Sequence, residues 1–126
     1  MRRRGADPTS DDTKARRLVI VLLLAIGAAV AGSIGACSYK SHVWNVAFDT
    51  VQVGDTEAAV ITRFGTQPSV RELPGKLFSR YATQPRSSEC AQRRWFENRL
   101  SLDTEAWSVE LDNAQRVTKK SHWISP

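Results

Sequence analysis

An uncharged run from Leu18 to Tyr39 constrains this chain more than any other feature. Its first part, "LVIVLLLAIGAAVA", is almost wholly aliphatic. As a helix, residues 18–36 would extend about 28 Å at about 1.5 Å per residue, close to the ~30 Å hydrocarbon core of a bilayer. Because a small soluble domain has no use for such a segment, residues 18–37 are predicted to be a membrane-spanning helix or a signal sequence.

The flanks of this run predict its orientation. Six basic residues lie within positions 1–17, whereas Lys40 is the only lysine or arginine in the twenty positions after Tyr39. By the positive-inside rule, residues 1–17 form a basic cytoplasmic region and residues 38–126 a periplasmic domain. The chain has 126 residues in all, which leaves room for one small domain with a modest core.

The charge of that domain bears on its partners. Residues 1–17 carry a net charge of +3, and residues 38–126 carry 12 basic and 10 acidic residues, a net of +2. The domain is therefore nearly neutral. We expect no nucleic-acid partner.

Two kinds of anchor fit the apolar run. Large aliphatic residues come first and small residues follow, which is the order of a signal peptide. "IGAC" at positions 34–37 also resembles the bacterial lipobox, in which the thiol of the cysteine, here Cys37, takes a diacylglycerol. The long basic region counts against cleavage and favours an uncleaved helix. A lipidated Cys37, followed by Ser38 and not by aspartate, would favour the outer membrane, and an uncleaved helix the inner membrane.

The cysteine count fits either anchor. Cys37 and Cys90 are the two cysteines of the chain. If Cys37 is lipidated, Cys90 is an odd thiol, and if it is not, a disulfide between them becomes an alternative in an oxidising compartment.

Local patterns after residue 40 predict an α+β domain. Thr56 is a predicted N-cap for a helix over Thr56–Phe64, with Gly65 and Pro68 as stop signals, and Val43–Phe48 has the apolar spacing of an earlier short helix. Residues 107–111 and 117–123 alternate as two half-buried strands of a hairpin, with Val117 and Trp123 on one face. Leu77–Tyr81 and Arg93–Leu102 supply one or two further strands. We therefore predict two short helices packed on a three- or four-stranded antiparallel sheet.

The stretch "VQVGDTEAAVITRFGTQPSV" resembles the signature of the SmpA/OmlA (BamE-like) lipoproteins of outer-membrane assembly. The matching positions are Val53, Gly54, Thr56, Glu57, Val60, Phe64, Gly65 and Pro68. The second half of the family pattern, an aromatic strand followed by a hairpin, is matched by Trp95, Val109, Leu111, Asp112 and Val117. The resemblance covers most of residues 46–123.

Two positions depart from the family pattern. Asp55 stands where the family usually has an apolar residue, which removes the hydrophobic staple of the helix. The hairpin lacks the expected glycine, so we expect Asn113 to supply any left-handed position. The matched glycines and proline fix backbone geometry, and the motif is thus expected to specify the fold and not a site.

Conspicuous side chains allow more than one interpretation. The four tryptophans are expected to build the core rather than a ligand groove. Arg93 and Arg94 beside Trp95 could form a surface for a protein partner or for lipid head groups, or they could protect an exposed strand edge from aggregation. Cys90 with His42 or His122 is the one conceivable catalytic pair, although a lone cysteine is more commonly inert. We expect no metal site, no cofactor and no enzymatic activity.

These observations predict a membrane-tethered periplasmic binding module. The family resemblance implies an accessory role in outer-membrane or cell-envelope assembly, through a sheet face or strand edge that docks a protein partner. One alternative is a single-pass inner-membrane protein of the same fold that acts as an inhibitor or sensor. A second alternative is a thiol enzyme that uses Cys90.

Overall fold

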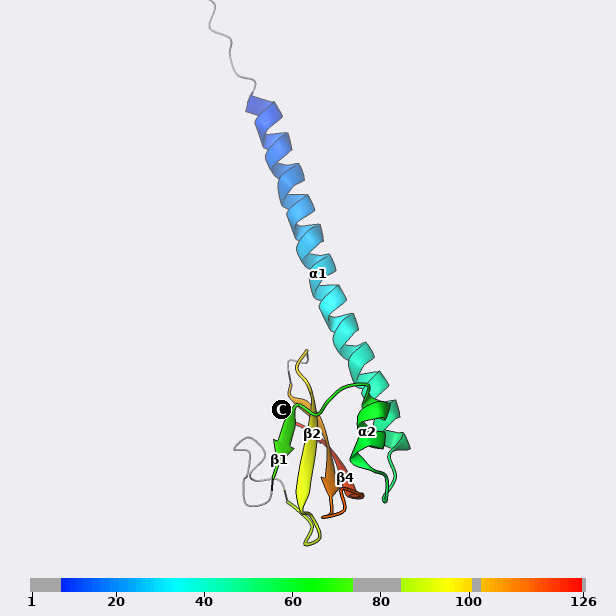
Figure 1. The fold of residues 1–126 in the computed structure, drawn as a ribbon. Coiled ribbons are helices and arrows are strands. Elements are labelled where there is room, and N and C mark those ends of the chain that lie inside the picture. The colour runs from blue at the N-terminus through cyan, green and yellow to red at the C-terminus, as the bar shows by residue number, and fades with distance from the viewer. Residues whose placement is uncertain (1–7, 74–84, 101–102, 126) are drawn as a thin grey trace, which may run out of the picture. The chain divides into compact units, whose positions relative to one another are not determined.

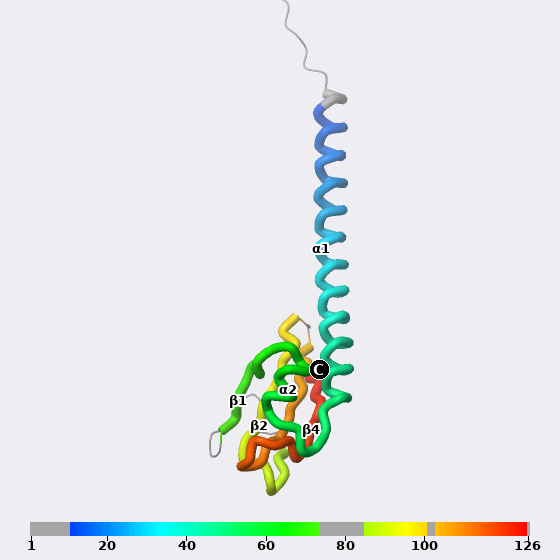
Figure 2. The backbone as a smooth tube through the Cα atoms, turned by 45° about the vertical axis from the view of Figure 1, so that its right-hand side comes forward, coloured from blue at the N-terminus to red at the C-terminus, as the bar shows by residue number. Residues whose placement is uncertain are grey.

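The computed structural model describes residues 8–73, 85–100 and 103–125. The chain divides into two compact units, Met1–Gly35 and Ala36–Pro126, and the long helix α1 (Pro8–Thr50) contributes to both. Figures 1 and 2 show the chain of the second unit passing from the end of α1 through the short helix α2 into a sheet. The class is α+β, as the sequence predicts.

Helix α1 contains the apolar run. It is long and apolar enough to cross a membrane, and a signal sequence near the N-terminus would meet the same criteria. The prediction of a separate short helix at Val43–Phe48 is wrong, because those residues form the end of α1. The physical reason is that "CSYKSH", the segment between the apolar run and Val43, contains no glycine or proline that would break the helix.

Helix α2 (Glu57–Phe64) begins and ends where its sequence predicts. Thr56 is the N-cap, and its hydroxyl accepts a hydrogen bond from Ala59 N at 3.2 Å. Gly65 follows with φ 70° and donates its N–H to Ile61 O, a left-handed cap that glycine adopts without steric cost. Asp55 occupies the staple position and instead accepts from Gln52 N at 2.7 Å and pairs with Arg63. A hydrogen bond and an ion pair thus replace the missing hydrophobic staple.

Four antiparallel strands form one sheet in the order β1-β2-β3-β4. They are β1 (Val70–Glu72), β2 (Gln92–Asn98), β3 (Glu105–Leu111) and β4 (Val117–Ile124). Central strands β2 and β3 pair along their whole length, from Gln92 opposite Leu111 to Asn98 opposite Glu105. The predicted strand at Leu77–Tyr81 lies outside the described residues.

The end of α1 and helix α2 pack on one face of this sheet, which we call the helix face. Its core residues are Trp44, Val51, Val60, Phe64, Phe96, Trp107, Val109, Leu111 and Val117. Aromatic rings make up its centre, with Phe64 stacked on Phe96 at 4.0 Å between ring centroids and Trp44 edge-on to Trp107 at 5.4 Å. The prediction that tryptophans build the core is therefore confirmed for Trp44 and Trp107.

The opposite side, which we call the second face, is also buried. Ser108 and Glu110 are 2% and 3% exposed, so the prediction that β3 is half-buried is wrong. The cause is the segment before β2, where Ser87 donates both its N–H and its hydroxyl to the Glu110 carboxylate. Trp95 and Ala106 form the apolar part of this face, with Trp123 packed against them.

The β3–β4 hairpin forms as predicted but differs in two details. A register irregularity opposite Glu110 and Leu111 leaves Thr118 unpaired, and it moves Trp123 to the second face while Val117 stays on the helix face. The left-handed residue of the turn is Gln115, with φ 57°, and not Asn113. Asp112 stabilises this turn by accepting from Ala114 N and Arg116 N, each at 2.9 Å.

Candidate functional site

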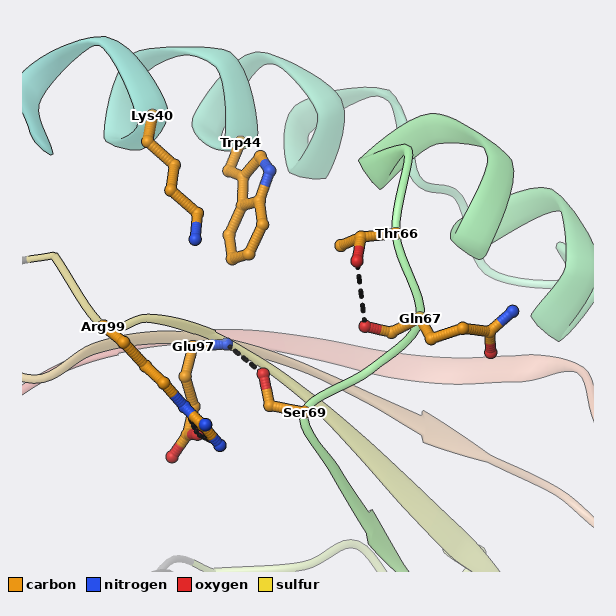
Figure 3. Close-up of a pocket in the computed structure, with 7 residues that line it drawn as sticks. All are labelled: Lys40, Trp44, Thr66, Gln67, Ser69, Glu97 and Arg99. Atoms are coloured by element: carbon orange, nitrogen blue, oxygen red, sulfur yellow. Dashed lines mark hydrogen bonds and ion pairs between the residues drawn. The ribbon is translucent and has the colours of Figure 1, made fainter. Parts of the chain in front are cut away.

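An open pocket of about 380 Å³ lies where the end of α1, the α2–β1 connection and the end of β2 meet (Figure 3). Helix α1 contributes Lys40 and Trp44. The remaining lining residues are Thr66, Gln67, Ser69, Glu97 and Arg99. We call this the Lys40–Arg99 pocket.

Local structure explains why these segments meet. Trp44 is held by edge-on contacts with Phe64 and Phe96, at 5.7 and 6.4 Å between ring centroids, which fixes α1 over the end of β2. Gly65 ends α2 and directs the chain back to the sheet. Ser69 then attaches this connection to β2, because its N–H donates to Trp95 O at 2.7 Å and its hydroxyl accepts from Glu97 N at 3.1 Å. The pocket walls are thus positioned by core packing and backbone hydrogen bonds.

The charges of the pocket favour an acidic group. Arg99 pairs with Glu97 at 3.2 Å, and the Glu97 side chain is 2% exposed while that of Arg99 is 73% exposed. Lys40 Nζ lies 4.3 Å from the centroid of the Trp44 ring, a cation–π contact. The one carboxylate of the pocket is neutralised by Arg99, so Lys40 supplies the excess positive charge. A carboxylate or another anion on a partner fits this arrangement.

Cys37 lies within α1 beside the end of β2. The Asn98 amide donates to the Cys37 carbonyl at 3.4 Å and lies 3.8 Å from its sulfur. The same amide donates to Ser41 Oγ at 2.9 Å, and Ser41 in turn donates to Glu105. Glu105 also pairs with His122 at 3.0 Å. This polar cluster attaches the first turn after Ala36 to the sheet.

A disulfide between the two cysteines does not fit this fold. Both are free. Cys37 contacts Asn98, the last residue of β2, whereas Cys90 lies two residues before Gln92, the first. The strand alone separates them by about 20 Å at about 3.3 Å per residue, while bridged Cα atoms lie within about 7 Å.

The conceivable thiol–histidine pair is not brought together. Cys90 contacts Gln92 O, and Ala91 bonds to Leu111 at the end of β3. His122 instead stacks on Trp107 and pairs with Glu105 at the other end of that strand, and His42 is exposed on α1. Burial raises the pKa of the Cys90 thiol, and the nearby Glu110 carboxylate raises it further. A raised pKa lowers the thiolate fraction that nucleophilic chemistry requires.

The prediction that Arg93, Arg94 and Trp95 form a partner or lipid surface is wrong. Their exposed fractions are 2%, 4% and 1%, because β2 is an inner strand of the sheet and not an edge. On the second face, Glu72 accepts from Arg93 Nε at 2.9 Å and from the Trp95 indole at 3.1 Å. On the helix face, Arg94 Nε donates to Glu57 at 2.8 Å. These buried side chains stabilise the folded domain and do not form an exposed surface.

The residues of the family-like motif surround α2. Val60 and Phe64 are buried in the helix-face core, while Val53 is 74% exposed. Gly54 has φ 94° and donates to Val117 O at 2.7 Å, which ties the turn before α2 to the start of β4. Pro68 lies in the α2–β1 connection. The motif therefore shapes the backbone that leads into the Lys40–Arg99 pocket, and it contributes none of the lining side chains.

Sequence reasoning missed the pocket itself. Its lining residues come from positions 40–44, 66–69 and 97–99, and only the packing of α1 and the β1–β2 pairing bring them together. No local spacing marks such a site. The one available signal was Lys40, an isolated cation directly after the uncharged run.

Among the described residues, no group of histidine, cysteine, aspartate and glutamate side chains is placed to hold a metal ion. Comparison of the chain with protein-family models, with curated proteins and with solved structures gives no match.

Proposed function

We propose that residues 38–126 form a membrane-tethered domain that binds a protein partner in the cell envelope. The SmpA/OmlA-like pattern around Gly54 and Gly65 supports an accessory role in outer-membrane or envelope assembly. The positive-inside asymmetry supports a periplasmic location for the domain. In this role the anchor raises the effective concentration of the domain at the membrane where its partner resides.

The observation that carries this proposal is the position of the Lys40–Arg99 pocket in the chain. Lys40 follows Ala36, the last residue of the apolar run, by four residues, about 6 Å along a helix. Trp44, one turn later, is already part of the domain core. In the sequence, the pocket therefore begins four residues after the apolar run that would anchor the domain.

The chemistry of the pocket specifies the kind of contact. An acidic side chain of the partner would enter between Lys40 and Arg99, with the Trp44 ring as an apolar wall. Glu97 holds Arg99 in place through their ion pair, so less side-chain entropy is lost when the partner binds. Exposed Gln67 and Ser69 offer amide and hydroxyl groups at the rim.

Photocrosslinking in intact cells tests the proposal. A crosslinking amino acid at Gln67, on the pocket rim, is expected to capture an envelope protein, and identification of an outer-membrane assembly component would support the accessory role. The matched control is the same amino acid at exposed Asn113, in the β3–β4 turn away from the pocket. Equal capture from both positions, or capture of no envelope protein, would count against it.

The anchor itself has two candidate forms. Lipidation of Cys37 is supported by "IGAC" after the apolar run, and all core residues of the domain lie beyond Cys37, so cleavage there would leave the core intact. An uncleaved inner-membrane anchor, and with it an inhibitor or sensor role, is supported by the unbroken path of α1 across Cys37. Intact mass spectrometry of the membrane fraction distinguishes them: an acylated N-terminal Cys37 indicates the lipoprotein, and a chain that retains residues 1–36 indicates the spanning helix.

A further inference from the structure

The two edges of the sheet differ in length. Strand β1 has three residues, Val70–Glu72, whereas β4 has eight, Val117–Ile124. An edge strand presents backbone N–H and C=O groups on its outer side, and a long edge can accept a further strand. The β4 edge is therefore the stronger candidate for strand addition.

The chain itself already pairs with the first residue of this edge. Gly54 N donates to Val117 O at 2.7 Å, and Val117 N donates to Asp55 O at 2.8 Å. Thr56 and Arg116 form an isolated antiparallel bridge next to them. In the described part of the chain, Thr118 pairs with no residue of β3, and Lys119–His122 have no backbone partner beyond their pairing with β3. An added strand would continue the pairing that residues 54–56 begin.

The side chains beside this open edge are basic. After Asp112 the sequence contains no aspartate or glutamate, but it contains three basic residues, Arg116, Lys119 and Lys120. Lys120 Nζ bonds to the Phe48 and Asp49 carbonyls at the end of α1, at 2.8 and 3.2 Å. Lys119 is exposed and forms no ion pair within the residues that the structure describes. Its charge is available to a neighbouring strand.

These charges determine which occupant fits. A second copy of the chain would bring the lysines of two β4 strands close together, and like charges on neighbouring strands are destabilising. Acidic side chains on an added strand would instead be attracted by the positive charges of Lys119 and Arg116. We propose that the β4 edge binds an extended segment of a partner protein that carries acidic side chains at alternate positions. This inference rests on the proposed function, since it assigns the partner a second contact beside the Lys40–Arg99 pocket.

Peptide binding to the full chain in detergent micelles tests the inference. The probe is a capped peptide of about eight residues that alternates glutamate with valine. We expect saturable binding, seen by fluorescence anisotropy, with slower amide hydrogen exchange at Thr118–His122. A lysine–valine peptide of equal length is expected to bind at least about tenfold more weakly. The glutamate peptide with every backbone nitrogen methylated keeps its charge but loses its donors, and it is expected not to bind.

Two protein variants test whether binding occurs at this edge. Lys119→Gln is expected to weaken binding of the glutamate peptide about fivefold and to keep the thermal unfolding midpoint, because Lys119 is exposed and no second carboxylate is placed opposite Glu110. Lys14→Gln, which neutralises an exposed lysine outside residues 38–126, is expected to leave peptide binding unchanged. Equal binding of the methylated peptide, or exchange protection confined to residues outside β4, would overturn the inference. If Gln67 still captures an envelope protein in that case, the proposed function stands without the strand contact.

Discussion

The two faces of the sheet are both buried, but they are stabilised by different interactions. On the helix face, nine buried apolar residues pack around stacked and edge-on aromatic rings. On the second face, the buried apolar cluster is Trp95 and Ala106, and charged side chains fill much of the rest. There Glu72 binds Arg93, Arg86 and the Trp95 indole together.

This difference predicts how substitutions on each face affect the stability of the domain. Apolar packing loses stability in proportion to the volume removed, and its neighbours relax partly into the space. A buried ion pair fails when one partner is removed, because the other charge remains without compensation in a poorly solvated place. The helix face should therefore tolerate conservative apolar substitution, and the second face should tolerate only paired changes.

The largest effect is expected from Trp107→Ala. This side chain is fully buried at the centre of the helix face, and its indole donates to Asn45 at 2.8 Å. Truncation should lower the free energy of unfolding by about 3–5 kcal/mol. Urea unfolding of the full chain in detergent micelles, followed by circular dichroism, measures it. Trp123→Ala on the partly buried rim of the second face serves as the control, and an equal loss there would contradict the comparison.

Glu72→Ala should come next, at about 3 kcal/mol, because it removes the buried carboxylate that pairs with the buried Arg93. Its distinguishing test is the double variant Glu72→Leu with Arg93→Leu. Removal of both charges should recover most of the stability that the single change loses. If the double variant is as unstable as Glu72→Ala in the same urea assay, the second face depends on more than charge pairing.

A smaller, pH-dependent effect is expected at Glu57. Burial alone would raise the pKa of this carboxyl, but hydrogen bonds and charges from Arg94 and Arg71 outweigh it and lower the pKa. A lowered folded-state pKa means that the stabilisation is complete above the ordinary value of about 4.3 and is lost as pH falls below it. As pH is lowered from about 7 to 3, the thermal unfolding midpoint should fall more steeply for the wild type than for Glu57→Gln. Parallel profiles would contradict this assignment.

The smallest effect is expected from Gln115→Gly. Gln115 adopts φ 57° in the β3–β4 turn, where a side chain costs energy that glycine does not. Part of the gain is lost because glycine is more flexible in the unfolded chain. A net stabilisation of about 0.5 kcal/mol is expected in urea unfolding, with Asn113→Gly as the control at the position that sequence reasoning favoured. A destabilised Gln115→Gly would mean that the side chain itself supports the turn.

The sequence predicts correctly those helices and strands that are determined by residues adjacent in the chain. Thr56 and Gly65 delimit α2 because capping depends on a few adjacent residues. The β3–β4 hairpin follows from alternation around a polar turn. The end of α1 was misjudged because the apolar spacing at residues 43–48 is the same for a separate helix and for the last turns of a longer one.

Features that depend on distant segments could not be predicted. The burial of Glu110 requires Ser87 from the chain before β2, and the burial of Arg93 requires Glu72 from β1. In sequence, Arg93 and Arg94 look like a surface patch, because a charge is usually solvated unless a partner is known. The Lys40–Arg99 pocket was missed for the same reason.

The central proposal, that the domain binds a protein partner through the Lys40–Arg99 pocket, is tested most directly by the crosslink yield from Gln67 in cells that carry Lys40→Glu with Arg99→Glu. Both side chains line the pocket and neither belongs to the buried core. The account predicts at least about a tenfold loss of the crosslinked complex, with the variant still in the membrane fraction at wild-type abundance. An unchanged yield from that variant would contradict it.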